Sequence, residues 1–265
     1  MNSNLSIILP VHELNDSTKE MFKQAVISVA NQKTAPDALV IVAPKNNTEL
    51  LSYLKGYDYG NAQSFTTILE NDGESDFASQ INYGVNNINT EWFFYLEFDD
   101  ILADHWVSNI VKYKEIYKDV DIFLPIIINI NKDGQFSGLT NEPVWAQEFC
   151  DEKGILDQGA LLRYENFSIN GAAIKTEVYK EHGGLKPSIK LTFIYEFLLR
   201  MTQQSARIMT IPKFAYQHMI LRDGSLFQTY KETMTPAQSD FWKRCAKKEY
   251  LWVVDRNIKY EVENA

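Results

Sequence analysis

The fold of this protein is decided by a short apolar stretch near the start of the sequence, Leu5-Ser6-Ile7-Ile8-Leu9-Pro10-Val11. It is rich in branched side chains and interrupted by proline, which is typical of a strand buried in a parallel sheet. A similar run, Ala38-Leu39-Val40-Ile41-Val42-Ala43, ends at a second proline. Between the two, apolar residues recur every three or four positions over residues 17–31, which predicts a helix with one buried stripe. We expect Asp16 or Ser17 to cap the start of that helix.

The same order of strand, helix and strand continues along the chain. Residues 65–69 and 91–98 have the composition of strands, and residues 49–55 and 76–87 have the periodicity of helices. This alternation predicts an α/β fold with a mostly parallel central sheet flanked by helices. Such sheets bind ligands beyond the carboxyl ends of their strands, so the loops there are the first place to look for a site.

The second half of the chain shows a looser pattern. We expect helices over residues 105–117, 176–182 and 192–203, and strands over 122–128 and 206–211, the last before Pro212. Gly183-Gly184 is a typical helix end. Thr235-Pro236-Ala237-Gln238 predicts the start of a terminal helix, because it combines a capping threonine, a proline in the first turn and a glutamine three residues after the cap.

Composition narrows the range of functions. Lys and Arg number 26 and Asp and Glu 35, so the net charge is −9, which argues against nucleic acid as a partner. The two cysteines form no CxxC pair, so neither a disulfide scaffold nor a zinc ribbon is expected. We find no signal-peptide pattern and no apolar run of ~20 residues. We therefore expect a soluble, cytoplasmic protein, with the inner face of a membrane left open as a peripheral location.

Acidic residues cluster where the aromatic strand ends, in Tyr95-Leu96-Glu97-Phe98-Asp99-Asp100. Like charges are costly to bring together unless a cation or hydrogen bonds compensate them. Hard divalent ions such as Mg²⁺ or Mn²⁺ prefer oxygen ligands and join carboxylates to phosphates. The cluster is thus either a metal site or an acidic turn that caps the next helix.

Several short motifs follow one another in a characteristic order, while neither GxGxxG nor GxxxxGK[ST] occurs. The motifs are the opening strand with His12, Ser28-Val29-Ala30-Asn31-Gln32, Asn71-Asp72-Gly73, residues 78–84, Glu97-Phe98-Asp99-Asp100, Gly183-Gly184-Leu185, and Tyr216-Gln217-His218 with Arg222-Asp223-Gly224-Ser225 behind it. Together they resemble the family-2 glycosyltransferases of the GT-A fold over residues 5–225. The acidic motif stands where that family has its metal-binding Asp-x-Asp.

The resemblance implies a set of site residues and a cofactor. The residues expected to bind a nucleotide-sugar donor are Pro10, His12, Glu13, Asn82, Glu97, Asp99 and Asp100. Asp99 and His218 would be ligands of Mn²⁺ or Mg²⁺. The implied reaction moves a sugar from the donor, with a UDP-sugar favoured, to a hydroxyl of a glycan or lipid-linked acceptor. The family generally inverts the anomeric centre, and polysaccharide biosynthesis is the implied setting.

The resemblance also implies a division of the chain. Residues 1–225 would form the GT-A domain, with 1–100 as its nucleotide-binding half and 101–225 as its acceptor half. Residues 226–265 would form a helical tail. The basic residues of that tail, Lys243, Arg244, Lys247 and Lys248, lie beside Phe241 and Trp242. They would contact a membrane surface or a protein partner, or else pack on their own domain.

Three departures from the family pattern are visible. The second strand lacks the aspartate that holds the base and has Ala43 there, and Glu97 replaces the first aspartate of the metal motif. Phe193 and Ile194 stand where the catalytic acids are expected, so the nearest acid, Glu196, is predicted as the base. The alternative for Glu196 is an ion pair with Arg200 at i,i+4.

Two other functions stay open from the sequence. A catalytically inactive GT-A-like binding or partner subunit would explain the missing acids. A nucleotidyltransferase would have a similar sheet and a similar acidic motif. Its phosphate loop is normally basic and rich in glycine, whereas residues 11–16 are acidic and contain no glycine.

Overall fold

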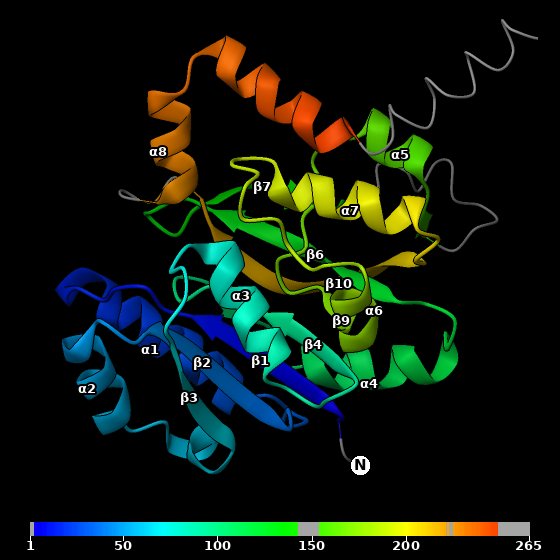
Figure 1. Ribbon diagram of the computed structural model, residues 1–265. Coiled ribbons are helices and arrows are strands. Elements are labelled where there is room, and N and C mark those ends of the chain that lie inside the picture. Colours follow the sequence, from blue (N-terminus) through cyan, green and yellow to red (C-terminus); the bar gives the residue numbers. More distant parts are fainter. Residues whose placement is uncertain (1–2, 143–153, 221, 223–224, 249–265) are drawn as a thin grey trace, which may run out of the picture.

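The computed structural model describes residues 3–142, 154–220, 222 and 225–248 (Figure 1). The strands are β1 (Leu5–Pro10), β2 (Ala38–Pro44), β3 (Thr66–Asn71), β4 (Trp92–Tyr95), β5 (Ile101–Leu102), β6 (Ile122–Ile130), β7 (Phe136–Thr140), β8 (Ile155–Leu156), β9 (Ala173–Lys175) and β10 (Ile208–Met219). The helices are α1 (Asp16–Ala30), α2 (Thr48–Gly56), α3 (Phe77–Asn86), α4 (Trp106–Ile116), α5 (Gln158–Arg163), α6 (Thr176–Glu181), α7 (Phe193–Gln203) and α8 (Leu226–Thr233), with a 3₁₀ helix at Gly60–Phe65 and a further helix over 236–248.

The strands form one mixed sheet in the order β3-β2-β1-β4-β9-β6-β10-β5, with β7 paired to β6 and β8 to β10. The pairs β2–β3, β1–β2, β1–β4 and β6–β10 are parallel. The short β9 lies antiparallel between β4 and β6, so the main strands on both sides of it point the same way. The predicted α/β fold with a mostly parallel sheet is confirmed.

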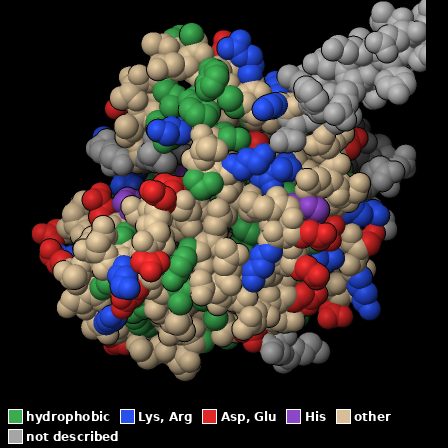
Figure 2. Space-filling model, in the orientation of Figure 1, with side chains coloured by type: hydrophobic (Ala, Val, Ile, Leu, Met, Phe, Trp, Pro, Cys, Tyr) green, Lys and Arg blue, Asp and Glu red, His purple; other side chains and the backbone are tan. Residues whose placement is uncertain are grey.

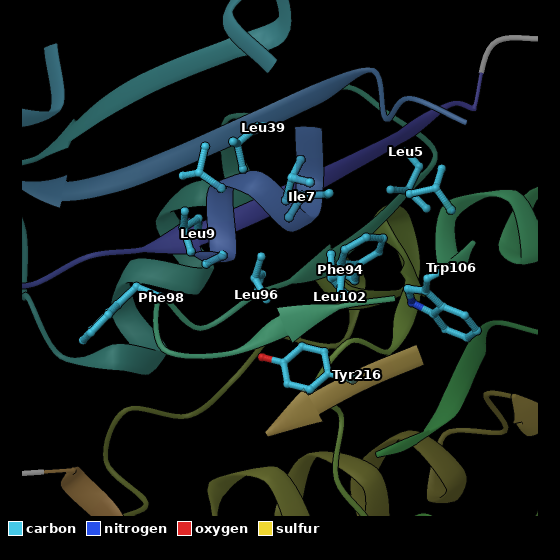
Figure 3. Packing of buried hydrophobic residues seen from close by; sticks show 14 of the residues in the cluster. Leu5, Ile7, Leu9, Leu39, Phe94, Leu96, Phe98, Leu102, Trp106 and Tyr216 are labelled. Carbon is cyan, nitrogen blue, oxygen red and sulfur yellow. The ribbon is translucent and has the colours of Figure 1, made fainter. Parts of the chain in front are cut away.

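The two faces of the sheet carry separate hydrophobic cores, because successive side chains of a strand point to opposite faces. Leu5, Ile7 and Leu9 of β1 pack with α1, α2 and α4, and Figure 3 shows this cluster from close by. Ile8, between them in sequence, belongs to the other core, which α3, α5, α6 and α7 cover. The apolar run of β1 therefore contributes side chains to the hydrophobic cores on both faces of the sheet.

Three local details differ from the expectations. Asn15, rather than Asp16 or Ser17, caps α1 and forms a reciprocal capping box with Thr18. β10 continues through Pro212 to Met219. Its pairing with β6 shifts register between Thr210 and Phe214, so no hydrogen bond from the missing N–H of Pro212 is needed there. The aromatic strand is shorter than predicted and ends at Tyr95, which leaves the acidic residues in a turn.

The terminal helix starts as its sequence predicts. The side chains of Thr235 and Gln238 exchange hydrogen bonds with each other's backbone N–H, at 3.3 and 2.8 Å. Lys243 and Lys247 of this helix form ion pairs with Glu165, at 3.6 and 2.5 Å. Among the described residues, no helix is both long and apolar enough to cross a membrane.

Candidate active site

The acidic residues lie in a tight turn after β4. The chain bends over Glu97 to Asp100, where the N–H of Asp100 donates to the carbonyl of Glu97 at 3.1 Å. It then returns as β5, which pairs antiparallel with the end of β10, with Ile101 opposite Gln217. This pairing brings the turn against the last residues of β10, although more than a hundred residues separate them in sequence.

Asp100 is the anchor between the turn and β10. Its side chain is buried, with 1% of the residue exposed. The N–H of Met219 donates to Oδ1 of Asp100 at 2.8 Å, and Nδ1 of His218 lies 2.9 Å from Oδ2. Both oxygens therefore have partners, and His218 is fixed beside the acidic turn.

Glu97 is held from two sides. Its backbone N–H donates to the hydroxyl oxygen of Tyr216 at 3.1 Å, and its Oε1 accepts from Nδ2 of Asn170 at 2.7 Å. Neither partner carries a positive charge. These two hydrogen bonds thus orient Glu97 and bring no positive charge to its carboxyl group.

Asp99 has a cationic partner. Nε of Arg222 donates to its Oδ2 at 2.5 Å, and the guanidinium carbon lies 5.3 Å from the centre of the Phe98 ring. Both charged side chains are largely buried. Arg222 therefore covers the turn from the segment that follows β10.

Crowding of charges shifts the pKa values of this group. Burial and then the charge of Asp100 raise the pKa of Glu97 to about 8. Burial and Asp100 also raise the pKa of Asp99, although Arg222 opposes them. Burial lowers the pKa of His218, but the neighbouring Asp100 outweighs it and the pKa rises to about 9. Without a further cation, the site therefore favours retaining protons.

The donor set fits a divalent metal ion. Ligand atoms of Glu97, Asp100 and His218 lie within 4.8 Å of one another. Two carboxylates and an imidazole can surround an ion such as Mn²⁺, and carboxylates alone suit Mg²⁺. Of the two predicted ligands, His218 belongs to this group and Asp99 does not. The carboxylate of Asp99 faces Arg222, and Asp100 takes its place.

The predicted donor-binding residues Pro10, His12 and Glu13 lie at the end of β1 and directly after it. Pro10 is a buried residue of β1 and pairs with Val42. His12 is exposed, and its ring centre lies 5.7 Å from that of Phe98 in the acidic turn. Glu13 is exposed beyond it. The structure thus brings His12 to the acidic turn, whereas Pro10 contributes to the sheet.

The side chain of Asn82, which the resemblance predicts to bind the donor, is hydrogen-bonded within the protein. Its Nδ2 donates to the carbonyl of Leu185 at 2.8 Å, and its Oδ1 accepts from the N–H of Leu185 at 3.0 Å and the hydroxyl of Tyr179 at 2.6 Å. The amide group is occupied by these bonds. They tie α3 to the turn after Gly184, so the geometry argues for a structural role.

The surroundings of Glu196 also differ from those expected for a catalytic base. It is 0% exposed, and its two oxygens accept from Nε and Nη2 of Arg200 at 2.8 and 3.0 Å. Nζ of Lys186 lies 2.7 Å from Oε1. Because both oxygens are buried against cations, this geometry argues against Glu196 as the base and supports the alternative ion pair with Arg200.

A separate apolar hollow of ≈ 200 Å³ lies between α8 and the loop before α7. Its lining residues are Leu191, Tyr230, Met234, Thr235, Pro236 and Ser239. Figure 2 shows hydrophobic side chains gathered at the top of the molecule, whereas acidic and basic side chains intermingle on the lower half of this face. The hollow shares no residue with the acidic turn.

Comparison with known proteins gives one curated relative and several solved structures. No protein-family model matches the sequence. A Haemophilus influenzae protein named an uncharacterized glycosyltransferase is 22% identical over 201 residues, which are 76% of this chain and 62% of the relative. The matched part is therefore less than two thirds of that relative's length.

The solved structures resemble this chain over most of its length. S. aureus TarS 1–349 in complex with UDP-GlcNAc superposes with a TM-score of 0.68 and 15% identity, over 95% of this chain and 67% of that one. The chain has the fold of TarS. The TarS complex with UDP matches with a TM-score of 0.56 and 14% identity, over 83% of this chain and 61% of that one. This match confirms the predicted GT-A-like fold class, and the name of the Haemophilus relative agrees with the resemblance of the sequence to glycosyltransferases.

Three residues beside the acidic turn were assigned no site role from the sequence, although two of them lie in the quoted motifs: Asn170, Tyr216 and Arg222. Weak signals for two of them exist. Asn170-Gly171 is a typical turn pair, and Tyr216 lies two residues before His218, on the same face of a strand. The pairing of Arg222 with Asp99 has no comparable local signal.

Proposed function

We propose that the protein is a glycosyltransferase that takes a sugar from a nucleoside-diphosphate donor, with a UDP-sugar favoured. The observation that carries the proposal is the partly buried group of Glu97, Asp100 and His218 beyond the carboxyl end of β4, where sheets of this kind bind ligands. The name of the Haemophilus relative supports the reaction class. The TarS complexes with UDP-GlcNAc and UDP support the donor class.

Residues in and beside the acidic turn would bind different parts of the donor. Glu97, Asp100 and His218 would hold the metal ion, and the imidazole favours Mn²⁺ over Mg²⁺ because Mg²⁺ takes mainly oxygen ligands. When bound, the ion supplies positive charge that offsets the charge growing on the leaving diphosphate. Arg222 presents a guanidinium beside this position, and its fork of donors matches phosphate oxygens. His12 borders the same turn and contacts Phe98.

The acceptor in this proposal is a hydroxyl of a glycan or a lipid-linked glycan, and the transfer inverts the anomeric centre. These two parts rest on the resemblance to family-2 glycosyltransferases, as do polysaccharide biosynthesis and a cytoplasmic location. Contact of the terminal helix with a membrane or a partner is a further proposal. Phe241, which is 50% exposed, would be its apolar contact.

The proposal is tested by incubating the purified protein with Mn²⁺ and a panel of UDP-sugars and measuring the UDP released. The wild-type protein should release UDP from at least one of them. Asp100→Asn keeps the shape but removes a charge, and it should lower the rate at least ~100-fold, the usual effect of removing a group that stabilises developing charge. Asp104→Asn is the matched control, since Asp104 is half-exposed and pairs with Lys33. Failure of the wild-type protein to bind UDP with Mn²⁺ present would overturn the proposal.

A second candidate function is a module that binds a nucleotide sugar without transferring it. Two observations favour it. Phe193, where the family has an acid, packs against Phe77 with ring centres 5.9 Å apart, and Glu196 is buried in an ion pair. Binding of UDP measured by calorimetry, together with no release of UDP from any donor in the panel, would select this candidate.

A further inference from the structure

The loop between α5 and β9, which is distant in sequence, contacts the acidic turn. Asn170 in this loop is 4% exposed, and its Nδ2 donates to Oε1 of Glu97 at 2.7 Å. We infer that Asn170 is a positioning residue that holds the carboxylate of Glu97 in place for the divalent cation. This inference rests on the metal site within the proposed function, and it adds a residue that the sequence motifs do not include.

Two hydroxyl groups fix the orientation of the Asn170 amide. The hydroxyls of Tyr95 and Ser168 donate to its Oδ1 at 2.9 and 2.6 Å. Oγ of Ser168 also accepts from the N–H of Asn170 at 3.2 Å, so its own proton is free to point toward Oδ1. With the amide oxygen held by two donors, the NH₂ group must face Glu97. An ionised carboxylate there can only accept, which agrees with this orientation.

The loop that carries Asn170 is itself fixed in place. Gly171 has a φ of +68°, and a Cβ at this position would lie 2.5 Å from Cδ2 of Tyr216. The carbonyl of Gly171 accepts from Nε1 of the buried Trp106 at 2.8 Å. Glycine therefore lets the backbone pass directly over the Tyr216 ring. The same loop thus positions both hydrogen-bond partners of Glu97: it carries the amide of Asn170, and it packs against the ring of Tyr216.

The chemistry of this support suits a metal ligand. Asn170 occupies one lone pair of Glu97, and a carboxylate offers about four, so capacity for a cation is left. Because the amide is neutral, it orients the carboxylate without cancelling the negative charge that attracts the cation. Asp99 differs, since Arg222 neutralises it. Outer hydrogen bonds of this kind change metal affinity by ~10–100-fold when they are removed.

Titration of Mn²⁺ into the full-length protein by calorimetry tests the inference without relying on turnover. Asn170→Ala should bind Mn²⁺ ~10–100-fold more weakly than the wild-type protein. Tyr95→Phe keeps the ring and removes the hydroxyl that orients the amide, and it should weaken binding by a smaller factor. Gln32→Ala is the control for loss of a buried amide, because Gln32 bonds to the backbone of Ser28, Ala103 and Val107. It should lower the melting temperature and leave the affinity for Mn²⁺ unchanged.

Each outcome decides between the alternatives. Affinity equal to wild type in Asn170→Ala, or an equal loss in Gln32→Ala, would overturn the inference. If Asn170→Ala fails to fold, wild-type affinity in Tyr95→Phe would overturn it. A wild-type protein that binds Mn²⁺ but no UDP-sugar, with Asn170→Ala weakened, would overturn the proposed function and support the inference. Absence of Mn²⁺ binding in the wild-type protein would overturn the metal site and the inference together.

Discussion

Carboxylates lie largely away from solvent both in α7 and in the turn after β4, and these two regions treat the charge in opposite ways. In α7, Glu196 is enclosed by Arg200, which binds both of its oxygens, and by Lys186. In the turn after β4, Glu97 and Asp100 lie close together, and the hydrogen bonds that Glu97 receives come from neutral groups. The first carboxylate is compensated by cations, and the second pair is compensated only in part.

This difference separates a structural acid from a candidate ligand. Burying a charge is costly unless a partner offsets the loss of water, and breaking a compensated pair is costly too. A buried pair of acids that lacks full compensation gains stability when a cation enters. Burial alone therefore does not mark a functional acid, whereas burial without a compensating cation does, as the raised pKa of Glu97 indicates.

The largest effect on stability is expected at the compensated pair. Arg200→Met leaves Glu196 buried without its guanidinium, and it should lower the free energy of unfolding by ~3–5 kcal/mol. Urea denaturation measures this. Arg207→Met is the control, because Arg207 and its partner Asp119 are both half-exposed or more, and it should cost less than ~1 kcal/mol. Equal losses in the two variants would contradict the distinction between the regions.

The largest effect on turnover is expected in the acidic turn. Asp99→Ala removes the partner that positions Arg222, and it should lower the rate of UDP release ~100-fold, or ~2.7 kcal/mol in activation free energy. The circular dichroism spectrum should stay that of the wild-type protein. Asp119→Ala, an exposed acid, should leave the rate unchanged. A wild-type rate in Asp99→Ala would exclude a role for this pair in the reaction.

A smaller effect of opposite sign is expected at Glu97. In metal-free protein, Glu97→Gln replaces a carboxyl group that must hold its proton in the folded state and keeps an oxygen for Asn170, so it should raise the free energy of unfolding by ~1–2 kcal/mol. Glu196→Gln should lower it, because Arg200 loses its charged partner. Thermal unfolding in the presence of a chelator measures both. Destabilisation by both variants would show that Glu97 is as well compensated as Glu196.

The pH dependence of the Glu97→Gln effect sharpens this test. Below its ordinary pKa of 4.5, Glu97 is protonated in both the folded and the unfolded chain. Between 4.5 and about 8 the unfolded chain loses this proton while the folded protein keeps it, so wild-type stability falls relative to the variant. The advantage of the variant should grow across this range and level off above it.

The smallest effect is expected at Lys186. Its ammonium is 2.7 Å from Glu196, but the side chain is 36% exposed, so solvent weakens the attraction. Lys186→Met should therefore cost less than ~1 kcal/mol of unfolding free energy, because Arg200 still binds both oxygens of Glu196. A loss as large as that of Arg200→Met would mean that the lysine, rather than the guanidinium, compensates the buried charge.

Features set by local patterns could be predicted from the sequence. The alternation of apolar strands and amphipathic helices gave the sheet, and the Thr235 to Gln238 box marked the start of the terminal helix. The acidic residues were recognised as a cluster because they are adjacent in the chain. The predicted cap of α1 is one or two residues too late, since Asn15, Asp16 and Ser17 are all good caps and the choice depends on the path of the loop that follows β1.

Features set by long-range contacts could not be predicted. Asn170 is 73 residues from Glu97 in sequence, and nothing in either segment indicates their hydrogen bond. The periodicity of α7 places Glu196 on the helix but does not show that its i,i+4 pair with Arg200 is buried. The sequence therefore left a base and an ion pair as alternatives, and burial by surrounding elements decided between them.

The central claim is that the acidic turn and His218 bind a divalent cation next to a diphosphate. Anomalous diffraction from crystals of the protein grown with Mn²⁺ and UDP tests it most directly. The predicted result is a manganese peak with Glu97, Asp100 and His218 as ligands and a phosphate oxygen in contact. A peak at another place, or UDP bound with these three side chains free of metal at saturating Mn²⁺, would contradict it.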